Sequence, residues 1–316
     1  MNTHTKKHTE GAFGLFVGSM IFALLASPLS AQNTFWALDE EDDNRIWAWS
    51  DYASDTSAVD HGRLQYNDGS GWEFFGSLQI EAFALTNGNI GYMLDEDDGL
   101  YSYDFGNITA GSGNTYQATT INADINIGGE ALAYNRFDGM LYLASVVGSA
   151  SSSDTNADAL YQINPATGAT TLVGTMSGLG EVLGYTDGLE FNHTTGALYA
   201  IDSNDDHLYQ INPGTGAIIA VLDNDTHGGI DSDADIESLA WDAATNRLIG
   251  VDNDNDKIVH LTFQNGNNVE LSNYRSHLGS DKDFEGTGII AGVPEPSVTA
   301  LFGIAGMVLI FRRRTN

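Results

Sequence analysis

The feature that most constrains the fold is an internal repeat of about 50 residues, found by comparing the chain with itself. Each copy has an acidic residue, a short apolar run, a turn, and a second apolar run that usually ends in aspartate. The copies begin at residues 81, 130, 187, 237 and 285, at intervals of 49, 57, 50 and 48 residues. The longest interval contains a Ser-, Asp- and Ala-rich stretch at residues 149–158, which has the composition of a lengthened loop tip. The chain is therefore expected to fold as copies of one supersecondary unit.

The composition of each unit indicates strands and turns. Residues 160–168 and 208–216 share the pattern Leu-Tyr-Gln-Ile-Asn-Pro-x-Thr-Gly, in which a short apolar run meets a turn. Elsewhere, similar runs are bounded by Asp, Asn and Gly clusters, which supply the backbone geometry that hairpins require. No stretch of the body keeps an apolar period of 3.6 residues over three turns. The sequence therefore predicts an all-β fold.

Unit size and the two ends of the repeat predict the architecture. About 50 residues with four short strands is the size of a β-propeller blade. Residues 35–39 match a second strand and residues 284–289 match only a first strand, so residues 284–290 are expected to complete the blade begun at residue 34. We predict five blades of four antiparallel strands, closed by pairing of the N- and C-terminal strands, with six blades as the alternative if residues 60–78 hold a degenerate copy. The repeats resemble secreted bacterial β-propellers with the same strand-and-turn motif, a resemblance that implies fold rather than activity.

The N-terminus has the organisation of a secretory signal peptide. Lys6 and Lys7 precede an apolar stretch at residues 12–26, and Leu-Ser-Ala at residues 29–31 offers a cleavage site. We therefore expect residues 1–31 to be removed, with a retained N-terminal anchor as the alternative. The absence of cysteine fits an exported protein that has neither disulfides nor thiol chemistry.

The C-terminus combines a Pro-Glu-Pro motif, an uncharged apolar run at residues 298–311 and an arginine cluster. The residues of the motif and the cluster are Pro294, Glu295, Pro296, Arg312, Arg313 and Arg314. This order resembles the PEP-CTERM sorting signal of Gram-negative bacteria. The resemblance implies that residues 292–316 hold the exported protein transiently at the inner membrane until an exosortase cuts near the motif. The product is then released or attached at the cell surface, often alongside exopolysaccharide and biofilm genes; an ordinary membrane anchor is the alternative.

These signals predict three segments: a signal peptide at 1–31, a propeller at 32–291 and a sorting signal at 292–316. The chain is strongly acidic, with 43 Asp and Glu against 12 Lys and Arg and a net charge of −31. Such a field repels nucleic acid and anionic lipid surfaces, and it attracts divalent cations and cationic partners. Solubility in salty surroundings is the alternative explanation, because screening tolerates dense surface carboxylates there.

One acidic residue starts each repeat, and the first strand of a blade is expected to be innermost. These lead acids are Glu81, Glu130, Asp187, Glu237 and Glu285. A ring of carboxylates around the central channel would need a cation between them, and calcium accepts many oxygen ligands at loose geometry. The alternative is that each acid only bonds nearby backbone amides at the start of its blade.

Two further acidic groups are candidate cation sites. Hairpin tips that begin at Asp39, Asp95, Asp202 and Asp252 all lie between second and third strands, so they should gather on one face. Residues 223–235 contain the alternating acids Asp223, Asp225, Asp231, Asp233 and Asp235, which would point to one side of an extended stretch. Asp and Asn are also ordinary turn residues, so solvated loops remain the alternative for both groups.

Catalytic motifs are scarce in this sequence. It contains no Gly-x-Ser-x-Gly, no His-Glu-x-x-His and no phosphate-binding glycine loop, and its histidines are scattered. Its tryptophans could stack on sugar rings or fill the blade cores; they are Trp36, Trp47, Trp49, Trp72 and Trp241.

The sequence therefore predicts an exported, exosortase-processed protein of the cell surface or extracellular matrix. It would act as a binding or scaffold module for polysaccharide, divalent cations such as Ca²⁺, or other surface proteins. Signal peptidase and exosortase would process it, and it would not bind nucleic acid. The alternatives are a calcium-dependent hydrolase of phosphoesterase or lactonase type, and a structural surface-layer subunit.

Overall fold

In the computed structural model, the repeats belong to a unit that spans Gln32–Gly292. The residues that the structure describes are 33–39, 44–50, 58–67, 69–75, 79–86, 88–145, 157–202, 207–222, 236–253, 257–263, 269–276 and 284–290. The expected signal peptide and sorting signal lie outside these residues. Within the described part of the chain, no helix is long and apolar enough to cross a bilayer.

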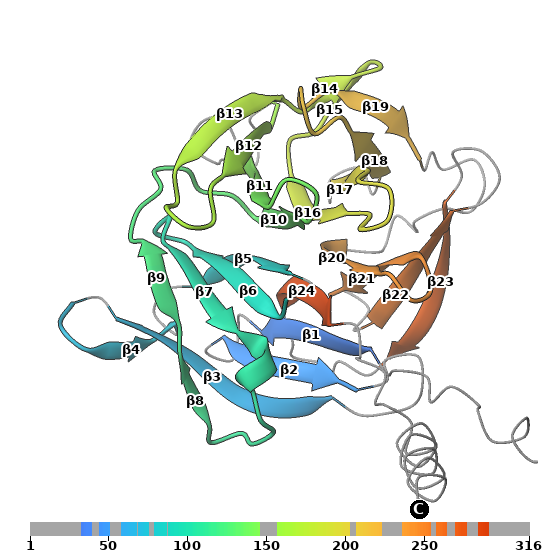
Figure 1. Cartoon of the computed structure of the whole chain (residues 1–316). Coiled ribbons are helices and arrows are strands. Elements are labelled where there is room, and N and C mark those ends of the chain that lie inside the picture. Colours follow the sequence, from blue (N-terminus) through green and yellow to red (C-terminus); the bar gives the residue numbers. More distant parts are fainter. Residues whose placement is uncertain are drawn as a thin grey trace, which may run out of the picture. The chain divides into compact units, whose positions relative to one another are not determined.

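Five sheets arranged in a ring form a five-bladed β-propeller (Figure 1), which confirms the predicted fold. Blade 1 contains β24 (Phe284–Ile290), β1 (Thr34–Asp39), β2 (Arg45–Trp49), β3 (Val59–Asn67), β4 (Trp72–Phe74) and β8 (Thr115–Gln117). Blade 2 contains β5 (Ile80–Leu85), β6 (Ile90–Asp95), β7 (Leu100–Asp104) and β9 (Thr119–Asn122), with the short helix η2 (Phe105–Asn107). Blade 3 contains β10 (Ala131–Asn135), β11 (Met140–Ser145), β12 (Ala159–Ile163) and β13 (Thr170–Thr175). Blade 4 contains β16 (Thr186–Phe191), β17 (Leu198–Asp202), β18 (His207–Ile211) and β19 (Ile218–Val221). Blade 5 contains β20 (Ile236–Asp242), β21 (Arg247–Asp252), β22 (Lys257–Phe263) and β23 (Val269–Ser276), and a small hairpin pairs β14 (Ser177–Gly178) with β15 (Glu181–Val182).

The ring closes through blade 1, as the sequence predicts. Strand β24 pairs antiparallel with β1, from Thr34 opposite Ile290 to Asp39 opposite Phe284. The innermost strands β24, β5, β10, β16 and β20 neighbour one another around the ring. Because β3 and β4 both belong to the sheet of blade 1, the alternative of a sixth blade at residues 60–78 is wrong.

Blade 1 departs from the expected four antiparallel strands at its outer edge. Its outer strand β8 comes from the chain between β7 and β9 of blade 2, and it pairs parallel with β3. The backbones come close enough that a Cβ atom at Gly62 would lie 2.2 Å from the carbonyl oxygen of Asn114. The amide of Arg63 donates a hydrogen bond to the same oxygen at 3.0 Å. The chain of blade 2 therefore contributes one strand to the sheet of blade 1, and this pairing connects the two blades.

The hydrophobic core is divided into five clusters, one for each pair of neighbouring blades. Trp36 of β1 packs with Phe83 of β5 and Phe105 of η2 between blades 1 and 2. The other four clusters occupy the interfaces 2–3, 3–4, 4–5 and 5–1. Side chains alternate across a strand, so the two faces of one sheet can pack against two different neighbours. This packing positions the first strands around the centre of the ring.

Candidate functional site

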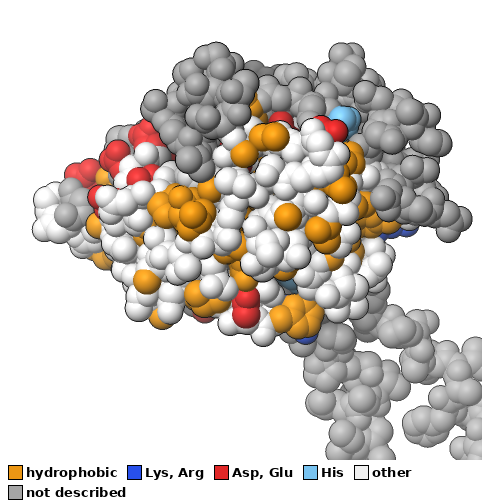
Figure 2. Space-filling model, turned by 90° about the horizontal axis from the view of Figure 1, so that it is seen from above, with side chains coloured by type: hydrophobic (Ala, Val, Ile, Leu, Met, Phe, Trp, Pro, Cys, Tyr) orange, Lys and Arg blue, Asp and Glu red, His pale blue; other side chains and the backbone are white. Residues whose placement is uncertain are grey.

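Strand register places acidic residues of four of the five blades at one end of the ring. Strands β5, β16, β20 and β24 begin opposite the ends of β6, β17, β21 and β1. The residues at those ends are Asp95, Asp202, Asp252 and Asp39. We call this end of the ring the acidic end. In Figure 2, which views the wall of the ring, most of the visible Asp and Glu side chains lie along one rim.

Four of the five lead acids lie at a β-bulge. Glu81, Asp187, Glu237 and Glu285 are each the extra residue between two paired positions of a first strand. A bulge leaves the extra residue unpaired in the ladder and re-aims its side chain. The alternation of side chains along the strand therefore does not determine whether a lead acid at a bulge points into the channel.

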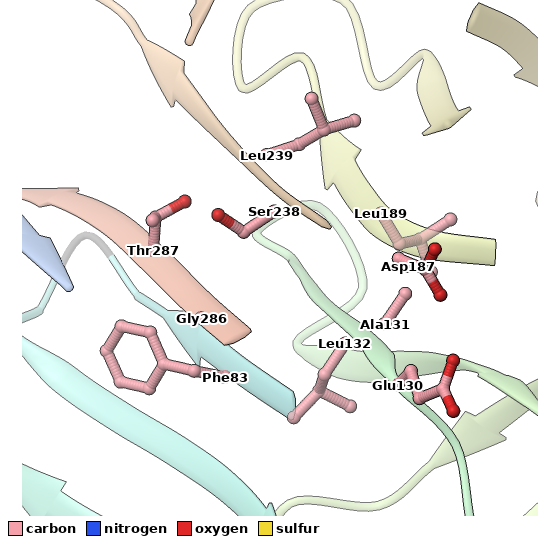
Figure 3. A pocket seen from close by; sticks show the side chains of 10 residues that line it. All are labelled: Phe83, Glu130, Ala131, Leu132, Asp187, Leu189, Ser238, Leu239, Gly286 and Thr287. Carbon is pink, nitrogen blue, oxygen red and sulfur yellow. The ribbon is translucent and has the colours of Figure 1, made fainter. Parts of the chain in front are cut away.

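A small pocket, open to solvent, lies where the five first strands meet, and only some lead acids line it (Figure 3). Its lining residues are Phe83, Glu130, Ala131, Leu132, Asp187, Leu189, Ser238, Leu239, Gly286 and Thr287. Glu130 and Asp187 are thus brought together as expected, whereas Glu81 and Glu237 are not among the lining residues. Glu237 instead accepts a hydrogen bond from the Asn253 side chain. For Glu285 the structure describes only the strand position.

Two hydroxyl groups, which the sequence analysis did not single out, face this pocket. The side chains of Ser238 and Thr287 are 3% and 2% exposed, and neither Ser238 Oγ nor Thr287 Oγ1 has a hydrogen-bond partner among the described residues. In Figure 3 these hydroxyls point toward one another at one side of the pocket, and the carboxylates of Glu130 and Asp187 lie at the other. Buried hydroxyls without partners cost free energy, so this side of the pocket is suited to a polar guest.

The aspartates that end four of the second strands are buried, so these residues are not the solvated turn residues that were the alternative to a cation site. Asp95 Oδ1 accepts hydrogen bonds from the amides of Gly99 at 2.6 Å and Asp97 at 3.2 Å. Asp39 accepts one from the indole of Trp47 at 3.1 Å. These carboxylates hold the second-to-third-strand connections at the acidic end. Burial, opposed by the hydrogen bonds from Gly99 and neighbouring groups, raises the pKa of Asp95.

Two more buried aspartates hold the start of blade 4. Asp202 Oδ2 accepts from the amides of Gly184 at 2.8 Å and Tyr185 at 3.2 Å, and Asp158 Oδ2 accepts from the amide of Thr186 at 2.9 Å. Burial raises the pKa of Asp158, and the negative charges of Asp202 and Glu130 raise it further. The carboxylates of Asp158, Asp202 and Glu130 are therefore electrostatic neighbours beside the pocket.

Other sequence-predicted site residues lie outside what the structure describes. Within the described chain, no three His, Asp or Glu side chains are grouped so that they could hold a metal ion. The proposed linker acids Asp223, Asp225, Asp231, Asp233 and Asp235 lie outside the described residues, as do Pro294, Glu295, Pro296, Arg312, Arg313 and Arg314.

A buried pair that the sequence analysis did not identify lies on blade 4. Nε2 of His193 is 3.3 Å from Oε1 of Glu190, and both side chains are buried. The same carboxylate oxygen accepts a hydrogen bond from the amide of Phe191 at 2.6 Å. In the sequence, the only sign of this pair is the spacing Glu-x-x-His. That spacing does not predict contact between the two side chains here, because strand β16 ends between them and a turn follows.

The tryptophans divide into core and surface residues. Trp36, Trp49 and Trp241 are buried in the clusters between blades, which confirms the core interpretation for these three. Trp72 is 45% exposed on β4. Of these four, only Trp72 offers its ring to a partner.

Comparisons with known proteins were made for the whole chain. No protein-family profile matches it, and no curated protein matches it significantly. Solved structures match at low identity. A chain of the nidogen/laminin complex has a TM-score of 0.49 and 12% identity, covering 83% of this chain and 99% of that chain. Glutaminyl cyclase of Myxococcus xanthus has a TM-score of 0.43 and 14% identity, covering 76% of this chain and 94% of that chain. The allergen Mala s 1 of Malassezia sympodialis has a TM-score of 0.44 and 14% identity, covering 78% of this chain and 76% of that chain. These likenesses carry no functional assignment.

Proposed function

We propose that the protein is an exported β-propeller that works at the cell surface or in the extracellular matrix as a binding or scaffold module. Its acidic end would bind divalent cations, calcium above all, or a cationic partner. The observation that carries the proposal is the convergence of carboxylates from the blades at one end of a closed ring.

Export and processing are supported by the two ends of the sequence. The N-terminal stretch has the order of a signal peptide, and the C-terminal stretch resembles a PEP-CTERM sorting signal. Signal peptidase and an exosortase would therefore release a propeller from the inner membrane, and exopolysaccharide or a biofilm matrix would be its surroundings.

The central pocket supports cation binding through Glu130 and Asp187. Two carboxylates supply fewer ligands than the six to eight oxygens that calcium takes, so the cation would keep much of its water shell. Binding should then be weak, with Kd on the order of 10⁻⁴ to 10⁻³ M, the range of extracellular calcium modules. The bound charge would also relieve repulsion among Glu130, Asp158 and Asp202.

A thermal-unfolding titration tests the cation proposal. After chelation of the full-length protein, millimolar calcium should raise Tm, because a ligand that binds the folded state stabilises it. Glu130→Gln combined with Asp187→Asn should abolish the shift. Glu73→Gln, which removes an exposed carboxylate on β4, should leave it intact. A Tm that does not respond to calcium, or an equal response in the pocket variant, contradicts the proposal.

Intact-mass analysis of the native protein tests the export proposal. The expected mass lacks residues 1–31 and everything beyond the Pro-Glu-Pro region. Full-length chain recovered from the cytosol, with its arginine terminus intact, would refute this part of the proposal.

A calcium-dependent hydrolase is the second candidate, favoured by the presence of two carboxylates and two unpartnered hydroxyls in one pocket. Turnover of an ester, lactone or phosphate substrate that requires calcium and is lost in Asp187→Asn would favour it. Calcium binding without turnover would favour the binding module.

A further inference from the structure

The outer side of blade 1 carries an exposed aromatic and polar surface that the acidic end does not use. Trp72 and Phe74 of β4 are 45% and 39% exposed. Strand β4 pairs with β3, which also pairs with β8, at the outer margin of the ring (Figure 1). We call this surface the aromatic face; its side chains are Arg63, Gln65, Asn67, Trp72, Phe74, Thr115 and Gln117.

Strand register shows that these seven side chains share one side of the sheet. Phe74 is opposite Gln65 and Trp72 is opposite Asn67 in the β3–β4 pair. In the parallel β3–β8 pair, Gln65 is level with Gln117, as Arg63 is with Thr115. Directly paired residues point to the same side of a sheet, and the alternate residues Leu64, Tyr66 and Tyr116 are buried on the other.

The aromatic face rests on a packed layer of rings. Phe75, the residue after β4, is fully buried, with its ring centroid 4.9 Å from those of Tyr66 and Tyr101. On the outer side, the guanidinium of Arg63 lies 5.8 Å from the centroid of Phe74. The two exposed rings are therefore held on a fixed base, which lowers the entropy lost when a ligand binds.

We propose that the aromatic face binds an extended, uncharged polysaccharide. Trp72 and Phe74 are two residues apart on one strand, which spaces their rings by about 7 Å along a line. The C–H faces of sugar rings are apolar and would stack on these aromatic rings. Sugar hydroxyls both donate and accept hydrogen bonds, as the amides of Gln65, Asn67 and Gln117 do.

Charge favours an uncharged polymer. None of the seven side chains is acidic and only Arg63 is charged, in a chain with a net charge of −31. The overall field would repel a polyanionic glycan and would leave a neutral one unaffected. Adsorption of a polycation would be expected at the acidic end instead.

Area argues against a protein partner or a second copy of the chain. A stable protein interface uses roughly 20–30 residues on each side. The aromatic face offers seven side chains on three strands, two of which have only 3 residues each. A few sugar units can be held by a surface of this size.

Affinity gel electrophoresis tests the proposal with hydroxyethyl cellulose, galactomannan and dextran as the probes. The full-length protein should be retarded by at least one of them, equally at low and high salt. Trp72→Ala and Phe74→Ala should each weaken retention by about tenfold, whereas Trp72→Tyr should preserve it. Binding should also shift the fluorescence of Trp72 to shorter wavelength.

A matched control is available on blade 3. Phe137 is 58% exposed and has the guanidinium of Arg136 5.6 Å from its ring, but it lies in a turn next to Asp138, outside the seven residues of the aromatic face. Phe137→Ala should leave retention unchanged, and unfolding curves confirm that each variant is folded. Because Trp72 and Phe74 are surface residues, loss of retention with an unchanged Tm assigns the effect to binding.

Three results would overturn the proposal: no retardation by any of the three polymers, retardation of Trp72→Ala and Phe74→Ala equal to that of the wild type, or a wild-type dimer that these substitutions make monomeric. The inference rests on the proposed function only in that the protein meets polysaccharide outside the cell. Calcium binding and processing do not involve Trp72 or Phe74. Polysaccharide binding by the aromatic face can therefore be refuted without refuting calcium binding or processing, and the reverse also holds.

Discussion

At the scale of single residues, buried aspartates combine structural and electrostatic roles. Asp158 and Asp202 accept hydrogen bonds from three successive backbone amides, of residues 184–186, that would otherwise need other partners. The carboxylate of Asp158 also lies close enough to those of Asp202 and Glu130 to be repelled by them. The start of blade 4 is thus held in part by Asp158, whose ionisation is unfavourable.

Asp158→Asn should make stability less sensitive to pH. The pKa of Asp158 is raised in the folded state, so the unfolded chain loses the proton first as pH rises. The contribution of Asp158 to the stability of the wild type therefore falls from about pH 4, the unfolded pKa, through the folded pKa. Asparagine keeps the acceptor for the Thr186 amide without the charge. The Tm of Asp158→Asn minus that of the wild type should increase between pH 4 and pH 7.

Asp158→Ala is the control for that experiment. It leaves the buried Thr186 amide without its acceptor and should cost about 1–3 kcal/mol at either pH. A Tm difference for Asp158→Asn that is constant with pH would show that the charge of Asp158 does not limit stability.

Sequence reasoning located the acidic residues but not the directions of their side chains. The lead acids recur in the sequence, and Glu130 and Asp187 do line the central pocket. Bulges at Glu81, Asp187, Glu237 and Glu285 break the two-residue period, and a bulge of one residue has no composition of its own. Solvated turns were one of two explanations for Asp39 and Asp95, because Asp is common in turns. Both residues are buried, and burial is decided by neighbouring segments distant in sequence.

At the scale of elements, the repeated Asn-Pro-x-Thr-Gly turn joins neighbouring blades. Asn164 and Asn212 each accept a hydrogen bond from the amide four residues later, that of Gly168 or Gly216. Both glycines have positive φ, of +68° and +75°. A Cβ atom on Gly168 would meet the Asn122 side chain of blade 2, and one on Gly216 would meet the Gly174 backbone of blade 3. The turn that closes a hairpin therefore also packs against the preceding blade.

Gly216→Ala should destabilise the protein by about 2–3 kcal/mol. The new Cβ would be strained by the φ of +75° and would lie 2.9 Å from backbone atoms of Gly174. Gly214→Ala in the same turn is the control, because its nearest atom would be Asn212 Oδ1 at 3.4 Å and its φ is not positive. Urea unfolding measures both. Equal stabilities for the two variants would contradict the role assigned to the turn.

The hairpins were predictable from sequence, and the borrowed strand β8 was not. Antiparallel neighbours are joined by turns whose residues are recognisable, so blades 3 and 4 follow from their repeats. Strand β8 pairs parallel with β3 across a long separation in sequence, and no turn joins them. The sequence named Trp72 as a residue that could stack on sugar rings, but the grouping of the aromatic face depends on how β4 and β8 pair with β3 and could not be predicted.

At the scale of the whole molecule, the ring depends on pairing between the two ends of the propeller. Without β24, strand β1 would present an open edge, and edges of sheets are prone to pair with other chains. The sequence predicted this closure because the repeat region begins with a second strand, at residues 35–39, and ends with a first strand, at residues 284–289. The acidic end and the aromatic face are then carried by one closed scaffold.

A disulfide between Thr34→Cys and Ile290→Cys tests the closure. The chain has no cysteine of its own, and these two residues are directly paired between β1 and β24. The double variant should oxidise to a cross-linked monomer whose Tm is higher than that of its reduced form, because a very long loop is closed. Thr34→Cys with Gly288→Cys is offset from the register by two residues and should cross-link poorly. Failure of the aligned pair to oxidise, or equal oxidation of both pairs, would show that the register is wrong.

Cation binding at the acidic end of the ring, centred on the pocket, is the central prediction for this protein. Crystals grown with calcium, and measured at a wavelength where its anomalous signal is appreciable, test that claim most directly. We predict an anomalous peak beside Glu130 and Asp187 that disappears in the Glu130→Gln, Asp187→Asn variant. An empty pocket at saturating calcium, or a peak that persists in the variant, would contradict the account.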